Sequence, residues 1–516
     1  FSGGYHLDGQ SPYGTTNHFI DGVDFEHSAY NDLGPTAFGL TDFDGDFATT
    51  GSARIDYVRT LAPLAEVEVG GNNYRRALLG GSHDAKERGQ WLGAVELVRN
   101  DGPWVQPEGV RKHNGVLRWS QGTRQNGLAV TALAYDAQWT ATEHVPERAI
   151  LSGEIGRYGA LTPSDGGRTQ RLGLSTEWGA SDEHSQTQAS AYVMRYALNL
   201  YSNPSGFMTG PQGDQHEQAD QRAVWGGRWQ RRIELGSAWL GSEWTWGAQL
   251  RQDRINTLGL YTTEARQRTD TVRQDRVLQT GAAWYTTLRT PWTPWLRSTL
   301  GLRQDRMQAT VTPVAGAFNA DNGGRVGRTL TSPKLGLALG PFDAFGGRDT
   351  MEFYADAGQG FHSNDARGAT ARVNPADGSP AEPVPLLVAA RGGEIGVRTV
   401  PLPGWQSSLA LWRLRVGSEM VFIGDAGVTE PKGGSQRYGF EWSNYWTPAR
   451  GWIIDSDVAG SHARFIAPNP DNGGRHVPNA IPLTASLGVA VDPGGAWFGG
   501  LRWRYLSSYP DRKSVV

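Results

Sequence analysis

The feature that most constrains this chain is an alternation of apolar and polar residues with a period of two. In residues 296–303, Leu296, Leu300 and Leu302 share one face of an extended segment, and Arg297 and Arg303 lie on the other. Successive side chains of a β-strand point to opposite faces, so such a segment is apolar on one side and polar on the other. About nineteen segments of this kind predict an all-β fold, a transmembrane antiparallel β-barrel with lipid outside and water inside.

The composition is compatible with a barrel and excludes several other classes. The chain has 516 residues, of which 38% are hydrophobic, and its mean hydropathy is -0.48. No apolar stretch reaches the roughly 20 residues that a membrane helix needs, whereas a barrel strand needs only ~9–11 residues, half of them polar. The absence of cysteine excludes disulfides and thiolate metal sites. A net charge of -3 gives no reason to expect a nucleic-acid partner.

The connections between the segments alternate between short and long, which is typical of outer-membrane barrels with short periplasmic turns and long external loops. The short ones are residues 120–126, 179–183, 290–294, 401–404, 447–451 and 492–495, and the long ones are residues 137–167, 201–218, 309–328, 362–385 and 423–434. Aromatic residues accompany both sets, and two interfacial girdles are expected of such a barrel. The short-turn side has Trp292, Trp295, Trp405, Trp446, Trp452 and Trp497, and the long-loop side has Tyr135, Tyr201, Tyr261 and Phe422.

A soluble all-β protein, such as a propeller or a sandwich, is the structural alternative. Its strands would usually be ~5–6 residues long. Here one expected strand covers residues 406–422, and we find no repeat of about 40–50 residues of the kind that a propeller shows. The pattern therefore favours the membrane barrel.

Specific strings narrow the class further. They are SPKLGL at 332–337, GFHSNDAR at 360–367, RGGEIGVR at 391–398 and RYGFEW at 437–442, with GDFATTG at 45–51 near the start. This succession resembles the distal barrel of TonB-dependent outer-membrane receptors, in particular a branch whose long loop begins with the GFHSNDAR string. GDFATTG resembles the junction between the plug domain and the first barrel strand.

The resemblance implies a plug inside a barrel of about 22 strands. We expect residues 1–50 to be the C-terminal remnant of the plug domain and residues 51–510 to form the barrel, with strands from 51–59 to 497–508. About three strands of the family barrel are then missing. Residues 511–516, DRKSVV, are what a string resembling a common sequencing-adapter read would encode, so we expect them to be an artefact.

The same resemblance implies an energised importer in the outer membrane of a Gram-negative bacterium. Its partners would be outer-membrane lipid, TonB and a small-molecule or metal-chelate ligand, and the contact segment for TonB is not in this sequence. We expect a monomer that is not an enzyme and has no cofactor, because nucleophile elbows, paired zinc histidines and phosphate loops are absent. A ferric siderophore or another metal chelate is the expected cargo by family frequency.

The candidate ligand-binding residues are at the start of one long loop: His362, Asn364, Asp365 and Arg367. Arginine can pair an anionic ligand bidentately, and histidine and aspartate can orient a chelate. The favoured structural interpretation is that this cluster caps the loop through bonds from side chain to backbone. Inward-facing arginines are expected to form charge ladders with Glu394, Glu441 and Asp455; they are Arg297, Arg303, Arg413, Arg415, Arg502 and Arg504.

Two further function classes stay open at this stage. One is a passive porin-like channel without a plug, and the other is a soluble β-rich carbohydrate-binding protein or enzyme. The junction-like string at 45–51 and the number of expected strands favour the TonB-dependent importer. The ligand itself is not readable from the sequence, because receptors for different ligands share one barrel and differ in their loops.

Overall fold

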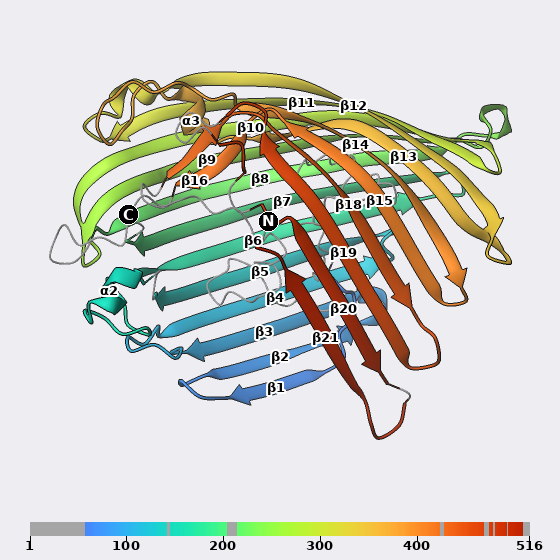
Figure 1. The fold of residues 1–516 in the computed structure, drawn as a ribbon, viewed down its shortest axis with the longest axis horizontal. Helices are drawn as coiled ribbons and strands as arrows, with labels where there is room; N and C mark the ends of the chain where they lie inside the picture. Colours follow the sequence, from blue (N-terminus) through green and yellow to red (C-terminus); the bar gives the residue numbers. More distant parts are fainter. Residues whose placement is uncertain are drawn as a thin grey trace.

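The fold is one long, curved antiparallel sheet. The computed structural model describes residues 57–141, 145–203, 214–423, 428–468, 474–477, 480–492 and 494–508. Nineteen strands form the main sheet, and two more form a separate hairpin. In the main sheet each strand pairs with the next main-sheet strand along the chain, from β1–β2 to β20–β21. Figure 1 shows the sheet curling round, from β1 to β21.

The strands lengthen toward the middle of the chain, as the bounds show. The first half of the main sheet comprises β1 (Leu64–Val69), β2 (Arg75–Asp84), β3 (Gln90–Asn100), β4 (Val110–Gly122), β5 (Gly127–Thr140), β6 (Gly166–Ser181), β7 (Ser185–Ser202), β8 (His216–Glu234), β9 (Glu243–Glu264) and β10 (Gln267–Thr293). The second half comprises β11 (Leu296–Ala315), β12 (Gly324–Ala344), β13 (Gly347–Ser363), β14 (Leu387–Leu402), β15 (Trp405–Val416), β18 (Ser435–Trp446), β19 (Trp452–Phe465), β20 (Leu483–Val491) and β21 (Gly499–Leu506).

Helical structure is confined to the connections of the described residues. The helices are α2 (Glu147–Leu151) and α3 (Ala366–Thr370), with short 3-10 turns at η2 (Lys86–Arg88), η3 (Ser237–Trp239) and η4 (Ala320–Asn322). None of these helices has the length and apolar character that a membrane span requires.

The predicted alternation between the two faces is confirmed on β11. Leu300 and Leu302 are 49% and 39% exposed on the outer face, whereas Arg303 is only 9% exposed on the inner, concave face. Leu335 and Leu337 of β12 lie opposite Leu300 and Ser298 and are also exposed. A shift by one residue would put every one of these side chains on the other face, so the register is strongly determined by the pattern.

Most of the expected first strand cannot be compared with the structure. Residues 51–56, which include most of the expected first strand, lie outside the described residues, and 57–59 are not a strand. The first strand among the described residues is β1, and its alternating Glu66 and Val67 belong to the next expected segment. No pairing joins β1 to β21 among the described residues, so each of these two strands has one partner there. The predicted plug remnant at 1–50 and the tail at 511–516 also lie outside the described residues.

One of the predicted long connections is shorter than expected, because strand pairing extends into it. β11 continues to Ala315 and β12 starts at Gly324, so only 316–323 of the expected loop 309–328 remain outside strands. The expected long strand 406–422 is divided: β15 ends at Val416, and β16 (Glu419–Ile423) pairs with β17 (Val428–Lys432) in the separate hairpin.

The aromatic girdle is confirmed at the short turns, where Trp292 and Trp295 are about half exposed. The girdle predicted at the long-loop end is wrong. Tyr135 and Tyr261 are 3% and 1% exposed, because the alternation of β5 and β9 turns both rings to the inner face. The Phe422 side chain lies outside the described residues.

The face assigned to two arginines was also wrong. Arg413 and Arg415 are exposed and share the outer face of β15 with Leu409 and Leu411. The inner face of β15 instead has Trp412, Leu414 and Val416, which pack in an apolar cluster with Val388 and Ala390 of β14. An apolar run at the inner face reverses the simple rule that polar residues face inward.

Other predicted charge pairs are present on the inner face. One has the predicted partner and one has a different acid. Arg502 pairs with Asp455 at 3.0 Å, as expected. Arg297 pairs with Glu352 rather than with one of the three predicted acids. Glu394 and Glu441 are buried on the inner face, at 3% and 8% exposure.

Candidate functional site

The four predicted binding residues lie where β13 ends and the chain turns into the connection to β14. His362 is the penultimate residue of β13, opposite Val388 of β14, and is half-buried. Asn364 is 4% exposed. Its backbone N–H donates to the Leu386 carbonyl at 3.0 Å, and its Nδ2 donates to the Pro385 carbonyl at 2.8 Å. Asn364 therefore closes the base of the connection.

Asp365 and Arg367 serve the short helix α3. The Asp365 carboxylate accepts a hydrogen bond from the Arg367 backbone N–H at 2.8 Å, so it is the N-cap of α3. The Arg367 guanidinium also pairs with this carboxylate, with 2.7 Å between Nη2 and Oδ2. Burial acts to raise the pKa of Asp365, but the attraction and hydrogen bonds of Arg367 outweigh it and hold that pKa below its ordinary value.

The connection folds back onto the inner face of the sheet. Ala366, Ala369 and Leu386 pack in one apolar cluster with the inner-face residues Ile255, Val277, Ala309 and Val311 of β9, β10 and β11. Strands two to four positions from β13 in the sheet therefore support α3, and the helix lies at the inner wall near the long-loop end. Small side chains at 366 and 369 allow this close approach of helix to sheet.

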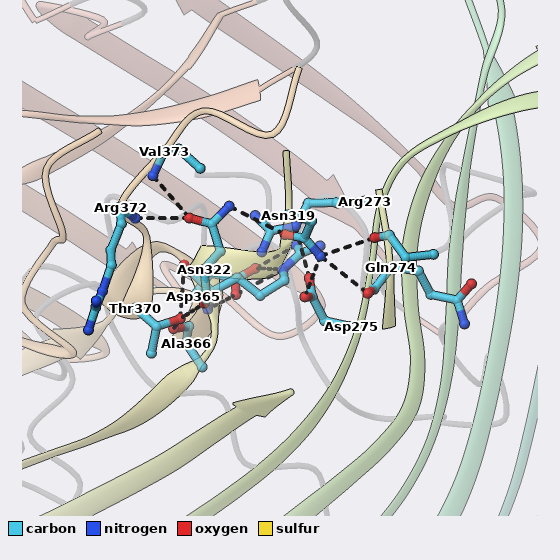
Figure 2. A network of polar contacts seen from close by, with 12 residues as sticks. Arg273, Gln274, Asp275, Asn319, Asn322, Asp365, Ala366, Thr370, Arg372 and Val373 are labelled. Atoms are coloured by element: carbon cyan, nitrogen blue, oxygen red, sulfur yellow. Dashed lines mark hydrogen bonds and ion pairs between the residues drawn. The ribbon is translucent and has the colours of Figure 1, made fainter. Parts of the chain in front are cut away.

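A polar network fixes the same segment to the loop between β11 and β12 (Figure 2). Asn322 is fully buried, and its Oδ1 accepts hydrogen bonds from the backbone N–H groups of Arg372 and Val373 at 2.9 and 3.1 Å. The Thr370 hydroxyl donates to the Asn322 carbonyl at 2.7 Å. The network continues from Asn322 Nδ2 to Asn319 Oδ1 at 3.3 Å. The loop at 316–323 thus acts as a clamp on the connection that follows β13.

The network ends in charged groups of the inner wall. Asn319 Nδ2 donates to Asp275 Oδ1 at 2.9 Å, and Arg273 Nε pairs with Asp275 Oδ2 at 2.9 Å. Arg273, Asp275, Asp365 and Arg367 are close enough to influence one another electrostatically. Two arginines and two aspartates balance in charge, so this cluster can orient a polar ligand without a large net field.

Sequence reasoning missed Arg273, Asp275, Asn319 and Asn322. A signal for the charged pair was present, because the string Arg-Gln-Asp-Arg occurs at 251–254, 273–276 and 303–306. The first and third residues of each string share the inner face and pair at 2.8 to 2.9 Å, as Arg251–Asp253, Arg273–Asp275 and Arg303–Asp305. The two asparagines had no comparable signal. Asn322 bonds to backbone groups of a distant loop, and Asn319 bonds to Asp275 on a strand 44 residues earlier.

The structure therefore unites the four predicted residues on one segment but gives each a structural partner or position. Asn364 and Asp365 cap the connection, which is the favoured sequence interpretation, and Arg367 is paired with Asp365. A ligand role for any of the four stays a prediction. No cluster of three or more His, Asp or Glu side chains with metal-site geometry occurs in the described parts of the chain.

Comparison with known proteins identifies the family. The model of the TonB dependent receptor-like β-barrel matches residues 99–514. The chain belongs to the TonB-dependent receptor family, whose barrels are outer-membrane proteins of Gram-negative bacteria and act as transporters rather than enzymes. No curated protein matches the sequence.

Solved structures share the fold at low sequence identity. The ferric citrate transporter FecA in its unliganded form is 15% identical, with a TM-score of 0.66 over 86% of this chain and 65% of that chain. The ferric-catecholate import receptor Fiu from E. coli K12 is 12% identical, with a TM-score of 0.65 over 87% and 72%. The siderophore receptor PiuA from Acinetobacter baumannii is 13% identical, with a TM-score of 0.63 over 82% and 68%. The chain spans about two thirds of the length of these proteins.

Proposed function

We propose that this chain is the barrel portion of an outer-membrane receptor that imports a scarce metal chelate, with a ferric siderophore as the preferred class. Membership of the family supports the transport role. The names of structural neighbours, which include siderophore, ferric citrate and copper transport proteins, support a metal chelate as cargo. The receptor would act as a monomer in outer-membrane lipid and receive energy from TonB.

The observation that carries the proposal is the inward fold of the connection after β13. A connection that packs α3 against β9, β10 and β11 puts arginine and aspartate side chains at the inner wall, in the path of a solute entering from the long-loop end. In this proposal residues 1–50 are part of the plug, residues 51–510 are barrel, and residues 511–516 are foreign to the receptor.

In this proposal His362 and Arg367 contact the chelate or order the connection that closes over it. Asn364 and Asp365 hold the backbone of the connection in the required position through the bonds described above. Arginine suits this role because its planar guanidinium forms paired hydrogen bonds with carboxylate and similar oxyanion groups.

The test is uptake by cells that express the receptor containing this chain. Radioactive iron is supplied as ferric citrate, a ferric catecholate or a ferric hydroxamate, and copper is supplied as Cu(II), each with and without a functional TonB. Uptake of one probe that requires both the receptor and TonB is the expected result. Receptor-dependent uptake that persists without TonB would instead identify a passive channel.

A second measurement addresses the residues. Arg367→Ala should weaken binding of the imported chelate by about 1.5–3 kcal/mol if its guanidinium contacts an anionic group, because charge-assisted bonds contribute about that much. Arg372→Ala, a change of the same type in the same connection, is the matched control, since its backbone N–H to Asn322 is retained. Equal binding by wild type and Arg367→Ala would leave the Arg367 side chain with its ion pair to Asp365 alone.

A further inference from the structure

Arginines form a row across the outer face of four neighbouring strands. Arg391 of β14 lies directly opposite Arg415 of β15, Arg415 lies opposite Gln436 of β18, and Gln436 lies opposite Arg464 of β19. All three arginines are exposed, and Arg413 is exposed two residues from Arg415 on the same face. We name Arg391, Arg413, Arg415 and Arg464 the second arginine row.

A similar row crosses the N-terminal part of the sheet. Arg75 of β2 lies directly opposite Arg99 of β3, and Arg99 lies opposite Arg111 of β4. All three are exposed on the outer face. We name them the first arginine row.

Both rows lie at the long-loop margin of the apolar belt. On the same outer face and nearer the short turns are Ile395 and Leu411 beside the second row, and Leu97 and Leu117 beside the first. From the short turn at 402–405 to the second row, the strands run for about the ~9–11 residues that cross a bilayer. The rows therefore occupy the level at which a girdle of tyrosines was expected and where lipid headgroups begin.

The charge of the rows is not balanced within the described protein. Like charges directly opposite each other on neighbouring strands are destabilising. The hydrogen bonds that the row arginines make there are to neutral amides: Arg391 Nε donates to Gln359 Oε1 at 2.9 Å, and Arg413 Nη2 donates to Gln436 Oε1 at 3.3 Å. Elsewhere on the same face an acid is supplied, since Arg168 of β6 pairs with Asp136 of β5 at 2.9 Å.

We propose that the two arginine rows bind the phosphate groups of anionic lipids in the leaflet at the long-loop end, with the acyl chains of these lipids against the apolar belt. Guanidinium groups bind phosphate oxygens bidentately, and several arginines in one row can share one diphosphorylated headgroup. The adjoining belt gives the same molecule an apolar surface, which a free phosphate ion would not use. This inference rests on the proposed location in the outer membrane, whose outer leaflet contains phosphorylated lipid A.

The test measures binding of lipid A to the purified receptor in neutral detergent. Diphosphorylated lipid A, enzymatically dephosphorylated lipid A and inorganic phosphate are titrated in parallel, with native mass spectrometry as the readout. The row variants are Arg391→Gln/Arg415→Gln and Arg75→Gln/Arg99→Gln/Arg111→Gln. The matched control is Arg254→Gln/Arg306→Gln, because these two arginines are exposed on the outer face but lie opposite Ala223, Leu278, Ala282 and Thr329.

The wild-type receptor should prefer the diphosphorylated form, and each row variant should bind it about tenfold more weakly, a loss of about 1.4 kcal/mol. The control should change affinity by less than about threefold, since its arginines do not share one headgroup. Equal affinity for the two lipids, unchanged affinity in the row variants, or competition by millimolar phosphate that displaces the lipid would overturn the proposal.

Thermal unfolding in detergent without lipid separates a binding role from a structural one. The row variants should be at least as stable as wild type, because removal of facing like charges relieves repulsion. Lower stability of both variants would show that the rows hold the sheet together and would contradict the proposal. The rows are on the outer face, so chelate uptake by the row variants should stay normal. If the wild-type receptor binds the lipid but imports no chelate, that result would count against the proposed transport function alone.

Discussion

Arg303 and Asp305 are bound to each other on the inner face of β11, with 2.8 Å between Arg303 Nη2 and Asp305 Oδ1. Both side chains are about one-tenth exposed, and Arg303 Nη2 also donates to Gln249 Oε1 of β9 at 2.7 Å. The residue between them, Gln304, and the next one, Arg306, face the other side of the sheet. One four-residue string thus supplies an internal ion pair and an external polar surface.

Removal of one member of this pair should be costly. Arg303→Leu should lower the free energy of unfolding by about 3–5 kcal/mol, because it breaks the buried ion pair between Arg303 and the Asp305 carboxylate. The double variant Arg303→Leu/Asp305→Leu should recover most of that loss. Denaturant titrations of the receptor in lipid vesicles measure both, and a double variant as unstable as the single one would contradict this account.

A charge on the outer face should be destabilising for a different reason. Leu337→Arg should cost about 2–4 kcal/mol, because the side chain is exposed near the middle of the apolar belt, where the lipid does not solvate a charge. The change Arg306→Lys, which keeps the charge on the outer face at the long-loop side, is the control and should be nearly neutral. Equal stability of Leu337→Arg and wild type in vesicles would reverse the assignment of the two faces.

The clamp at 316–323 should be sensitive to one amide. Asn322→Ala removes the acceptor for two half-buried hydrogen bonds from backbone N–H groups, and each such bond contributes about 0.5–1.5 kcal/mol. We expect faster hydrogen exchange in the connection from α3 to β14, with little change in the strands. Ala376→Ser, an exposed change in the same connection, should leave exchange at wild-type rates. Unchanged exchange in Asn322→Ala would show that apolar packing alone holds α3.

The order of α3 should depend on acid pH. The pKa of Asp365 is lower in the folded connection than the ordinary value of about 3.9. A group with a lowered pKa contributes stability above its unfolded pKa and loses it as the pH falls through the folded value. A spin label at Ala376→Cys should therefore be equally immobile from neutral pH to about pH 4 and become mobile below it. In Asp365→Asn the label should lose this pH dependence.

The absence of cysteine permits a direct test of facing. A single cysteine at Leu337, on the outer face, should resist a water-soluble maleimide in vesicles, whereas one at Ala338, opposite Arg297 on the inner face, should react. The reaction rates differ because lipid excludes the reagent from the outer face. Equal reaction at both positions would be inconsistent with a lipid-covered belt.

Much of the architecture is predictable from local pattern. Alternation at Leu300, Leu302 and Arg303 determines which face of β11 is apolar, because the side-chain period of a strand is two. The short turns are predictable from their composition and length, and the number of strands follows from counting these segments. The resemblance of the GFHSNDAR and RYGFEW strings to one receptor family was confirmed by the match over residues 99–514.

The errors occurred where local pattern is ambiguous. On β15 an apolar series and a basic series alternate, and the sequence alone does not say which one faces inward. Pairing with β14 decides it, because Arg391 and Arg415 share a register position, as do Glu394 and Trp412. The tyrosines at 135 and 261 were assigned to a girdle from their place in the chain, whereas their place in the alternation turns them inward.

The sequence by itself determined that this chain forms a curved antiparallel sheet with an apolar outer face, because that information is contained in neighbouring residues. Tertiary structure alone decided that Asn322 clamps the connection after β13, that Ala366 packs against β9 to β11, and that arginines distant in sequence form rows. These features depend on the register between strands and on a loop that folds back across the sheet. Such contacts join residues tens of positions apart, and no local period encodes them.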